Sequence, residues 1–515
     1  MDISSTGKPA VRIASARGRW IVLATVLGSS MVLLGSTVTN VALPRIGEDF
    51  GTDLAGLQWT VNAYMLTLAG LILLGGSLGD RFGRRRIFLL GVVWFAAASL
   101  LCGLAADTGM LITARALQGV GGALLTPGSL ALIEASIHPD DRARAVGLWA
   151  GFGGIGAALG PFLGGWLVDG PGWRWTFLLN VPLALACVPI AIRHVPESVG
   201  LRAQAGPPRV RRGASKPRPG FDVLGAVLGA LALALATYAL TEARTGGIVV
   251  AVAAAGSVVA GVSFVLVERS RPDPMMPLGI FSSRRFTSVN LITLCVYAGV
   301  GGFFFLTALE LQIVVGYSAL QAGAAMLPNS LVMLLFSSRS GVLAQRLGPR
   351  LPLTVGPLIC AAGTLMMLRV GTGAVYLPDV FPALLVIGIG MVMMVAPLTV
   401  TLLSSVADEN AGLASGINNA AARASGLVAV AALPLLVGMG PEAYRTGAAF
   451  DQSFGRAMPI CAALLTLGAG LAFVTLRAPA PVPRRLPWRI HGWFTEPSLT
   501  PWFSHRGADN ESRRL

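Results

Sequence analysis

Three polar side chains lie inside long apolar stretches of this sequence, where a charge or an amide needs a partner. Arg115 and Gln118 are one helical turn apart, so their side chains share a face of a helix. Glu310 is the one clear acid in such a stretch. A buried carboxyl group can take up and release a proton. A guanidinium at this depth is costly to bury, so it needs a partner and indicates a function. The three residues are therefore candidates for proton coupling or for lining a cavity.

Each of these residues also has a structural interpretation. Arg115 can be satisfied by backbone carbonyl groups at helix ends. Glu310 lies roughly 24 residues into its apolar stretch, or about 36 Å along a helix, which places it near one end where water can solvate it. The sequence leaves open whether Glu310 is a protonation site, a contact for a cationic substrate or a solvated side chain.

The residue patterns of an enzyme are missing from the chain. It has four histidines, no G-x-x-x-x-G-K-[ST] phosphate-binding loop and no paired carboxylates. The five cysteines all fall in apolar stretches and lack metal-ligand spacing. We therefore expect no enzymatic activity, no metal site and no cofactor, and the missing phosphate-binding loop argues against ATP-driven transport.

The elements that position these residues are membrane helices. Of the 515 residues, 54% are hydrophobic and only 12% are charged, with a mean hydropathy of +0.70. Apolar stretches of about 20 residues, each long enough to cross a bilayer, recur along the chain. We predict an all-α membrane protein with fourteen spans: 20–43, 57–78, 87–105, 110–133, 144–168, 175–193, 221–241, 248–267, 286–314, 320–344, 351–371, 379–403, 412–438 and 456–476.

The distribution of positive charge predicts the orientation of these spans. Fourteen spans place both termini on one side, and most of the 39 lysines and arginines fall on that side too. Because short cytoplasmic loops are rich in Lys and Arg, we expect both termini in the cytoplasm of a cell with this protein in its plasma membrane. The net charge of +15 then needs no nucleic-acid partner.

The chain divides into two halves that carry a repeated loop. Residues 76–86 and 341–350 both follow the pattern G-x-L-small-(D/Q)-R-x-G-x-R. We predict an N-terminal segment 1–19, a six-helix bundle 20–193, a cytoplasmic linker 194–220, two extra helices 221–267, a second six-helix bundle 286–476 and a cytoplasmic tail 477–515. Such duplicated bundles are typical of transporters whose substrate site lies between the halves.

Four stretches together resemble the major facilitator superfamily, specifically its fourteen-helix drug:proton antiporter branch. They are 40–44 at the end of the first span, the signature loop 76–88, the fourth-span motif 111–121 and the antiporter motif 156–167. The resemblance covers roughly residues 20–476. It implies the major facilitator fold, with two six-helix bundles and two extra helices that are central in the sequence.

The resemblance also assigns roles to residues of these motifs. The resemblance implies that the signature loop is a gate, in which a carboxylate pairs with arginines in one conformational state and separates from them in the other. The alternative is that the arginines only hold this loop on the cytoplasmic side of the membrane. Arg115 is implied to line the cavity and to take part in proton coupling. The gating residues are Gly76, Asp80, Arg81, Gly83 and Arg84; the antiporter motif contributes Gly156, Gly160, Pro161, Gly164 and Gly165; and possible polar contacts are Asn40, Asn418 and Arg423.

The chain departs from this branch at the first span. The branch usually carries an aspartate where this sequence has Gly35. A proton carrier needs a group that changes charge, and glycine has none. Proton coupling through the first span is therefore in doubt, and Glu310 can be a compensating protonation site.

Three functions are compatible with these observations. The first is a monomeric exporter of small hydrophobic or cationic compounds, working by alternating access in exchange for protons. The second is a facilitator or dedicated exporter of one metabolite without proton coupling through the first span, as Gly35 suggests. A membrane scaffold or sensor is the third, but it would need a sizeable soluble domain or a degraded signature loop, and the chain has neither.

Overall fold

The computed structural model describes residues 11–199, 222–271, 274–407, 411–440 and 446–476. Within these residues the apolar stretches are α-helices, because in hydrocarbon a helix is the way for a single segment to bond all its backbone groups. In the described part of the chain, thirteen helices are long and apolar enough to cross a membrane. The remaining predicted span, 144–168, lies in α5, which is 31 residues long. The predicted all-α membrane class is confirmed, and the count of fourteen spans matches approximately.

The first half of the chain forms one set of packed helices. Its first helix is longer than the predicted span 20–43, because Ser15 caps its start by accepting from the Gly18 N–H and Gly51, with φ of 60°, ends it. The helices are α1 (Ala16–Phe50), α2 (Leu54–Phe82), α3 (Arg84–Gly103), α4 (Thr108–Ser136), α5 (Pro139–Asp169), α6 (Trp175–Leu178) and α7 (Asn180–His194).

The second half repeats this arrangement with more breaks. The predicted span 320–344 is interrupted at Met326, just before Pro328, whose ring lacks the N–H of a continuous helix. The helices are α11 (Arg284–Ile313), α12 (Ala319–Ala325), α13 (Leu327–Leu347), α14 (Arg350–Met366), α15 (Phe381–Leu403), α16 (Ala411–Leu436) and α18 (Gly447–Thr475), with the short turns η1 (Leu278–Ser282), η2 (Met367–Arg369) and η3 (Tyr376–Val380).

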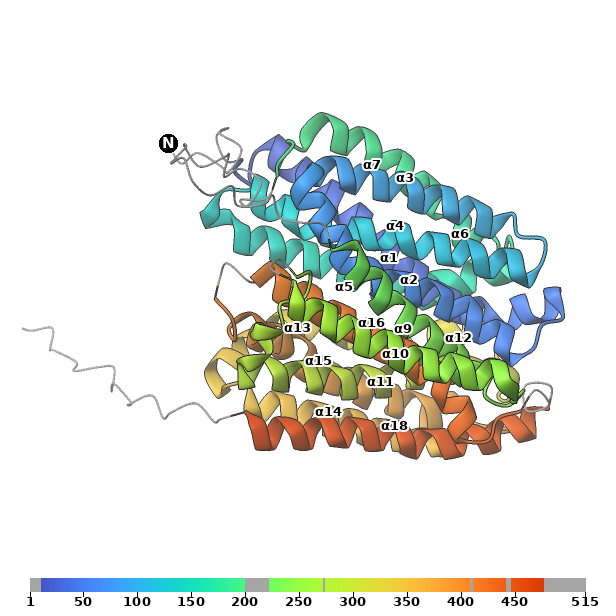
Figure 1. Ribbon diagram of the computed structural model, residues 1–515. Helices are drawn as coiled ribbons and strands as arrows, with labels where there is room; N and C mark the ends of the chain where they lie inside the picture. The colour runs from blue at the N-terminus through green and yellow to red at the C-terminus, as the bar shows by residue number, and fades with distance from the viewer. Residues whose placement is uncertain (1–10, 200–221, 272–273, 408–410, 441–445, 477–515) are drawn as a thin grey trace, which may run out of the picture. The chain divides into compact units, whose positions relative to one another are not determined.

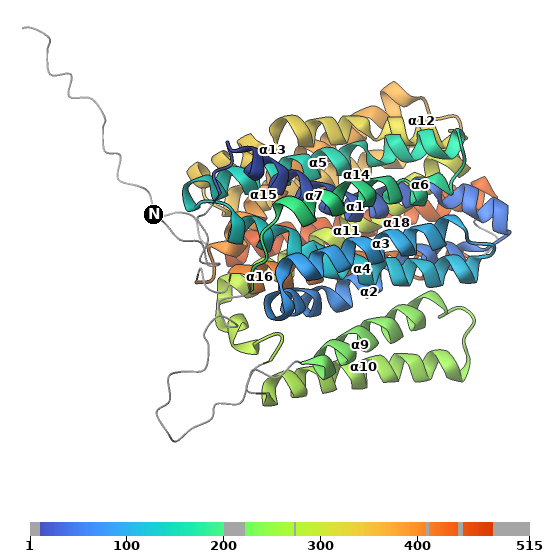
Figure 2. The same ribbon diagram turned by 90° about the horizontal axis from the view of Figure 1, so that it is seen from above.

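The two extra helices, α9 (Val223–Thr241) and α10 (Gly247–Ser270), form a hairpin at one edge. Figure 2 shows the pair beside the other helices, with α10 on the outside. The inner helix, α9, packs on α2 of the first half and on α16 of the second. The pair is therefore central in the sequence but peripheral in space, and it touches both halves.

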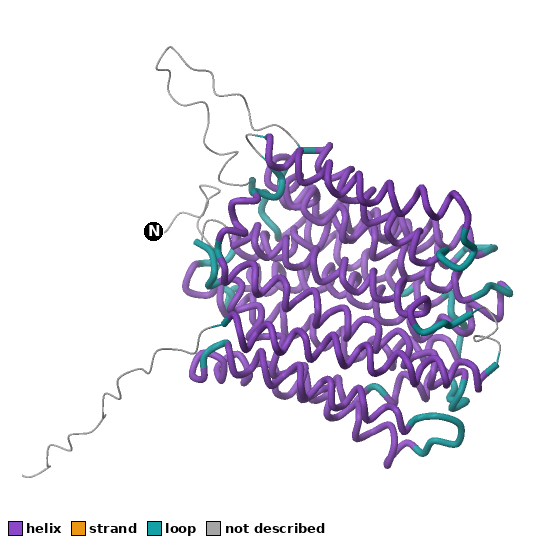
Figure 3. The backbone as a smooth tube through the Cα atoms, turned by 60° about the horizontal axis from the view of Figure 1, so that its bottom comes forward, coloured by secondary structure: helices purple, strands orange, loops and turns teal. Residues whose placement is uncertain are grey.

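The helices run side by side between two ends, with the loops gathered at those ends (Figures 1 and 3). We call the end where α1 begins, at Ala16, the proximal end, and the end where α1 finishes, at Phe50, the distal end. Since consecutive long helices alternate in direction, α11 and α16 also finish at the distal end, and α18 begins there.

The apolar core is shared at the distal end and divided at the proximal end. One cluster, which we call the shared cluster, includes Val41 and Leu57 of the first half and Leu309, Leu433 and Phe454 of the second. The fully buried members of each of the other two clusters come from one half, although the partly buried Leu73 of α2 packs against the cluster of the second half. The buried members of one lie between residues 13 and 195, and those of the other between 286 and 476.

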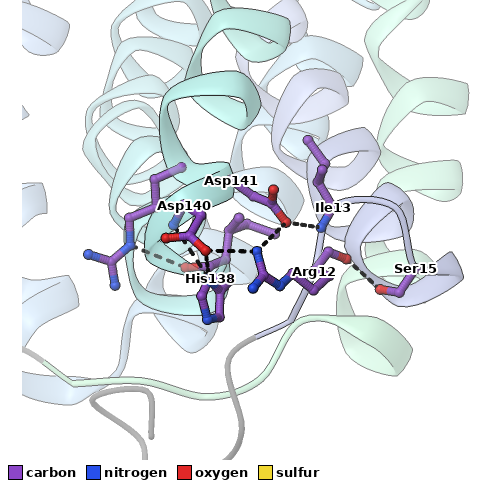
Figure 4. A network of polar contacts seen from close by, with 8 residues as sticks. Arg12, Ile13, Ser15, His138, Asp140 and Asp141 are labelled. Carbon is purple, nitrogen blue, oxygen red and sulfur yellow. Dashed lines mark hydrogen bonds and ion pairs between the residues drawn. The ribbon is translucent and has the colours of Figure 1, made fainter. Parts of the chain in front are cut away.

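Residues 11–15 of the predicted N-terminal segment pack on the junction between α4 and α5 at the proximal end (Figure 4). The Val11 backbone bridges to Ile137, and the Arg12 guanidinium lies 3.0 Å from an Asp140 oxygen. The Ile13 N–H donates to Asp141 at 3.1 Å. These contacts tie the start of α1 to the start of α5.

Candidate functional site

Arg115 is fully buried on α4 and bonded only to neutral groups among the described residues. Its Nε donates to the Thr60 carbonyl on α2 at 3.0 Å, and one terminal nitrogen donates to the Gly35 carbonyl on α1 at 3.2 Å. The same nitrogen bonds the Gln118 side chain. The Tyr64 ring lies 4.2 Å from the guanidinium carbon, a cation–π contact. Arg115 thus joins three helices of the first half.

Gly35 takes part in this arrangement through its backbone. Its carbonyl accepts from Arg115 and, at 2.9 Å, from the Thr39 hydroxyl. A Cβ at Gly35 would lie 3.1 Å from the Phe95 ring and 3.9 Å from the Gln118 amide nitrogen. A carboxyl group restored here would therefore start beside Gln118, the direct partner of Arg115. At position 35 the chain thus offers Arg115 a backbone carbonyl and no side chain.

Glu310, in the second half, differs from Arg115 because its buried side chain has no hydrogen-bond partner among the described residues. Its side chain is fully buried at the distal part of α11, and neither carboxyl oxygen accepts a hydrogen bond from any described residue. The interpretation of Glu310 as a solvated side chain is therefore wrong. The side chain that interacts with it is another acid, Asp451 on α18, which is within hydrogen-bonding range.

The Glu310–Asp451 pair is a feature that the sequence did not predict. The expectation of no paired carboxylates is wrong here and at a second place, where Asp222 interacts with Glu268 at the proximal ends of α9 and α10. Asp451 was missed because the predicted span began at 456, which left Asp451 in a loop. The helix begins at Gly447 and carries Asp451 onto the face that packs on α11.

The signature loop is held together within the first half. The Arg84 guanidinium donates to Asp80 at 2.8 Å and to the Ala131 carbonyl on α4 at 3.2 Å. Glu197, after α7, accepts from the Arg85 N–H at 3.0 Å. Gly83 has φ of 109°, and a Cβ there would lie 2.6 Å from Glu197, so only glycine fits.

The gating role of this loop stays a prediction. The carboxylate of Asp80 is 56% exposed and pairs with Arg84 in its own half. Arg81 stacks its guanidinium carbon 5.6 Å from the neighbouring Phe82 ring, and Gly76 lies in ordinary contact with Pro127 of α4. In the repeated loop of the second half, the side chains of residues 341–347 lie outside the described part of the structure.

The glycines of the antiporter motif let α5 approach two different helices. Cβ atoms at Gly160 and Gly164 would lie 2.1 Å from the Thr37 hydroxyl and 2.9 Å from Val38, both on α1. A Cβ at Gly156 would also face α1, at an ordinary 3.5 Å from Ser30. On the other side, Gly165 faces the Ala319 carbonyl of α12, and Gly323 of α12 faces the Pro161 carbonyl. The motif therefore packs α5 on both halves near the distal end.

The remaining predicted polar residues have different surroundings. Asn418 on α16 donates to the Thr293 hydroxyl at 2.7 Å and to Asn290 at 3.2 Å, both on α11. Arg423, also on α16, interacts electrostatically with Tyr64 of the first half and Tyr297 of the second. The side-chain oxygen of Asn40 is buried and has no partner among the described residues.

Comparison with known proteins places this geometry in a family. Residues 25–430 match the Major Facilitator Superfamily. The puromycin resistance protein pur8 of Streptomyces alboniger is 37% identical over 426 residues, which is 81% of each chain. The tetracenomycin C resistance and export protein of Streptomyces glaucescens is 33% identical over 456 residues, 86% of this chain and 79% of that protein.

Solved structures share the fold at lower sequence identity. A bacterial homolog to the human lysosomal transporter Spinster, in an inward-facing and unoccupied conformation, is 18% identical with a TM-score of 0.59, covering 90% of this chain and 97% of that one. A POT family transporter in complex with 5-aminolevulinic acid is 14% identical with a TM-score of 0.63, covering 90% and 99%. With the helix arrangement and the sequence match over most of its length, this chain belongs to the Major Facilitator Superfamily.

Proposed function

We propose that the protein exports small hydrophobic or cationic compounds, antibiotics among them, from the cell by alternating access in exchange for protons. The printed names of its relatives support export: one is a puromycin resistance protein and another a tetracenomycin C resistance and export protein. The excess of Lys and Arg near the proximal end supports a cytoplasmic position for that end.

The division of the apolar core is the observation that carries alternating access. At the distal end the halves share one cluster and exchange hydrogen bonds, such as Gln58 to the Val430 carbonyl at 2.6 Å and Gln312 to the Val41 carbonyl at 3.1 Å. Toward the proximal end each half keeps its own cluster. A protein built this way can separate its halves at one end while they stay packed at the other.

A cross-link at the distal end tests this mechanism. The Leu320 N–H donates to Asp169 at 2.9 Å across the halves. We would replace both residues with cysteine, in intact cells expressing the full chain, and measure efflux of puromycin and of ethidium. A bifunctional thiol reagent should stop efflux in the double variant and reduction should restore it, while the single variants Asp169→Cys and Leu320→Cys keep transporting. Unchanged efflux after complete cross-linking would contradict alternating access.

One observation favours the alternative, a facilitator or dedicated exporter of one metabolite that is not coupled to protons. Gly35 offers only a carbonyl to Arg115, and the hydrogen-bond partners of Arg115 among the described residues are all neutral. Proteoliposomes with a pH dye inside separate the two functions. Puromycin-dependent proton movement supports exchange, whereas puromycin transport without proton movement supports the alternative.

A further inference from the structure

The carboxyl group of Glu310 is buried without any of the usual ways to stabilise a negative charge. Both of its oxygens lack a hydrogen-bond donor among the described residues, which leave out 441–445. On α11 it follows Leu306 and Leu309 and precedes Leu311, all of them buried members of the shared cluster. Of the helices packed on α11, only α18 presents a charged group to it within the described chain, and that group is Asp451.

A second carboxyl pair, Asp222 and Glu268, shows which stabilising contacts the Glu310 carboxyl lacks. Glu268 is also buried, but it accepts from the Met276 N–H at 2.9 Å. Its neighbour Asp222 accepts from the Gly225 N–H at 2.8 Å and pairs with the Arg271 guanidinium at 3.2 Å. One oxygen of each carboxyl group in the Asp222–Glu268 pair therefore has a backbone donor, and Asp222 also has a cation, while Glu268 Oε1 and Asp222 Oδ2 have no partner among the described residues. The Glu310 carboxyl has neither a backbone donor nor a cation in the described structure.

Two carboxyl groups within hydrogen-bonding range can bond each other only when one carries a proton. We infer that Glu310 and Asp451 form a proton-binding site in which one proton, covalently bound to one carboxyl oxygen, is hydrogen-bonded to the other carboxyl. The occupied pair then carries a single negative charge. Release of the proton would leave two carboxylates facing each other, with Glu310 fully buried, which is strongly unfavourable.

The position of the pair connects it to the closure of the distal end. Gln312, on the same turn of α11 as Glu310, donates to the Val41 carbonyl of α1 across the halves. Asp451 also lies against Gly371, since a Cβ there would be 3.2 Å from its carboxyl. The site is embedded in the shared cluster that joins the halves. Proton binding should therefore favour the conformation with a closed distal end, and this part of the inference rests on the proposed function.

Infrared spectroscopy of the purified full-length protein tests the site without any transport. Titration of the parent should show the carbonyl stretch of a protonated carboxylic acid that persists well above the pH at which an exposed carboxyl group ionises. Glu310→Gln should abolish this band. In Asp451→Asn the band should disappear at lower pH, because the like charge is gone and the amide can donate to Glu310. The matched control is Glu268→Gln, which alters the second carboxyl pair at the other end and should keep the band that Glu310→Gln abolishes.

The outcomes separate the site from the proposed function. An unchanged band in Glu310→Gln, with the variant folded by gel filtration, would overturn the site even if transport of puromycin proves proton-coupled. A band lost in Glu310→Gln but kept in Glu268→Gln would establish the site even if transport proves uncoupled.

Closure is measured separately, with spin labels on cysteines at positions 169 and 320. The parent should show a larger population at the short distance at low pH, and Glu310→Gln should show the same population at every pH. An equal pH response in both proteins would overturn the link between the proton and closure.

Discussion

Arg115 and Glu310 are both completely buried, one in each half, yet their environments have opposite chemistry. Arg115 donates to two backbone carbonyls and to Gln118, and the Tyr64 ring lies over its guanidinium. Glu310 has no donor within the described structure and interacts with a second acid. A charge with a complete set of acceptors can stay charged in every state. A carboxyl without donors is best accommodated when it carries a proton, so its charge depends on conditions.

This contrast changes the expected location of proton chemistry in the chain. The resemblance to the antiporter branch directs attention to α1, but there the chain has Gly35, whose carbonyl is a permanent, non-titrating acceptor for Arg115. Among the described residues, the buried carboxyl group with no hydrogen-bond donor to either oxygen is that of Glu310, on α11 of the second half. The first half thus supplies a fixed charge, and the second supplies the group whose charge can change.

Removal of the Arg115 side chain should have the largest effect. Arg115→Ala deletes three hydrogen bonds and leaves buried acceptors and a cavity among α1, α2 and α4, so we expect a stability loss of about 3 kcal/mol or more. Puromycin efflux should fall at least about tenfold. Thermal unfolding in detergent and efflux from cells measure the two effects. Arg115→Lys restores the charge but not the forked geometry, and its full rescue of stability would contradict the account of Arg115 as a junction of three helices.

The matching change in the second half should behave in the opposite way. Glu310→Gln removes a buried acid that has no donors, so the free energy of unfolding should stay within about 1 kcal/mol of the parent or rise. The parent should lose stability as pH rises through neutrality, since unfolding releases the proton that the folded pair holds, and Glu310→Gln should lack that dependence. Thermal unfolding across a pH series is the measurement. A loss as large as that of Arg115→Ala would show that Glu310 is bonded after all, and the comparison would fail.

Much of the fold was predictable from the sequence because hydrocarbon imposes simple rules. Apolar length predicted the spans, and the repeated loop with the number of spans predicted two halves with an extra pair between them in sequence. Helix ends were less accurate, since caps such as Ser15 and breaks such as Pro328 act over single residues. The partners of buried polar groups were not predictable. Asp451 meets Glu310 only through the packing of α18 on α11, and no local pattern in either segment signals that contact.

Restoration of an acid on α1 would test whether a titratable group in the first half can replace Glu310. Gly35→Asp places a carboxyl beside Gln118 and within reach of Arg115, at the cost of a tight contact with the Phe95 ring of about 1–2 kcal/mol. In the Glu310→Gln background we expect part of the proton movement to return, because a titratable group again lies in the first half. Gly35→Ala makes the same contact without the acid and is the control. Equal proton movement in the two double variants would show that position 35 has no role.

Substitution of Gln118 should have the smallest effect on stability and efflux. Its side chain accepts from Arg115 and donates to the Ser99 hydroxyl at 2.6 Å. Gln118→Leu removes both bonds while the two backbone carbonyls continue to hold Arg115, so we expect a stability loss of about 1–2 kcal/mol and efflux reduced only a few-fold. Thermal unfolding and ethidium efflux provide the values. Complete loss of efflux in a stable Gln118→Leu protein would instead place Gln118 in direct contact with the substrate.

The most direct test of the account is puromycin-triggered proton movement in proteoliposomes with a pH dye inside, compared among the parent, Glu310→Gln and Glu268→Gln. The account predicts that parent and Glu268→Gln move protons in proportion to puromycin, and that Glu310→Gln loses most of this proton movement while remaining folded. Proton movement of equal size in Glu310→Gln would contradict it, because the proton would then be carried by some group other than the Glu310–Asp451 pair.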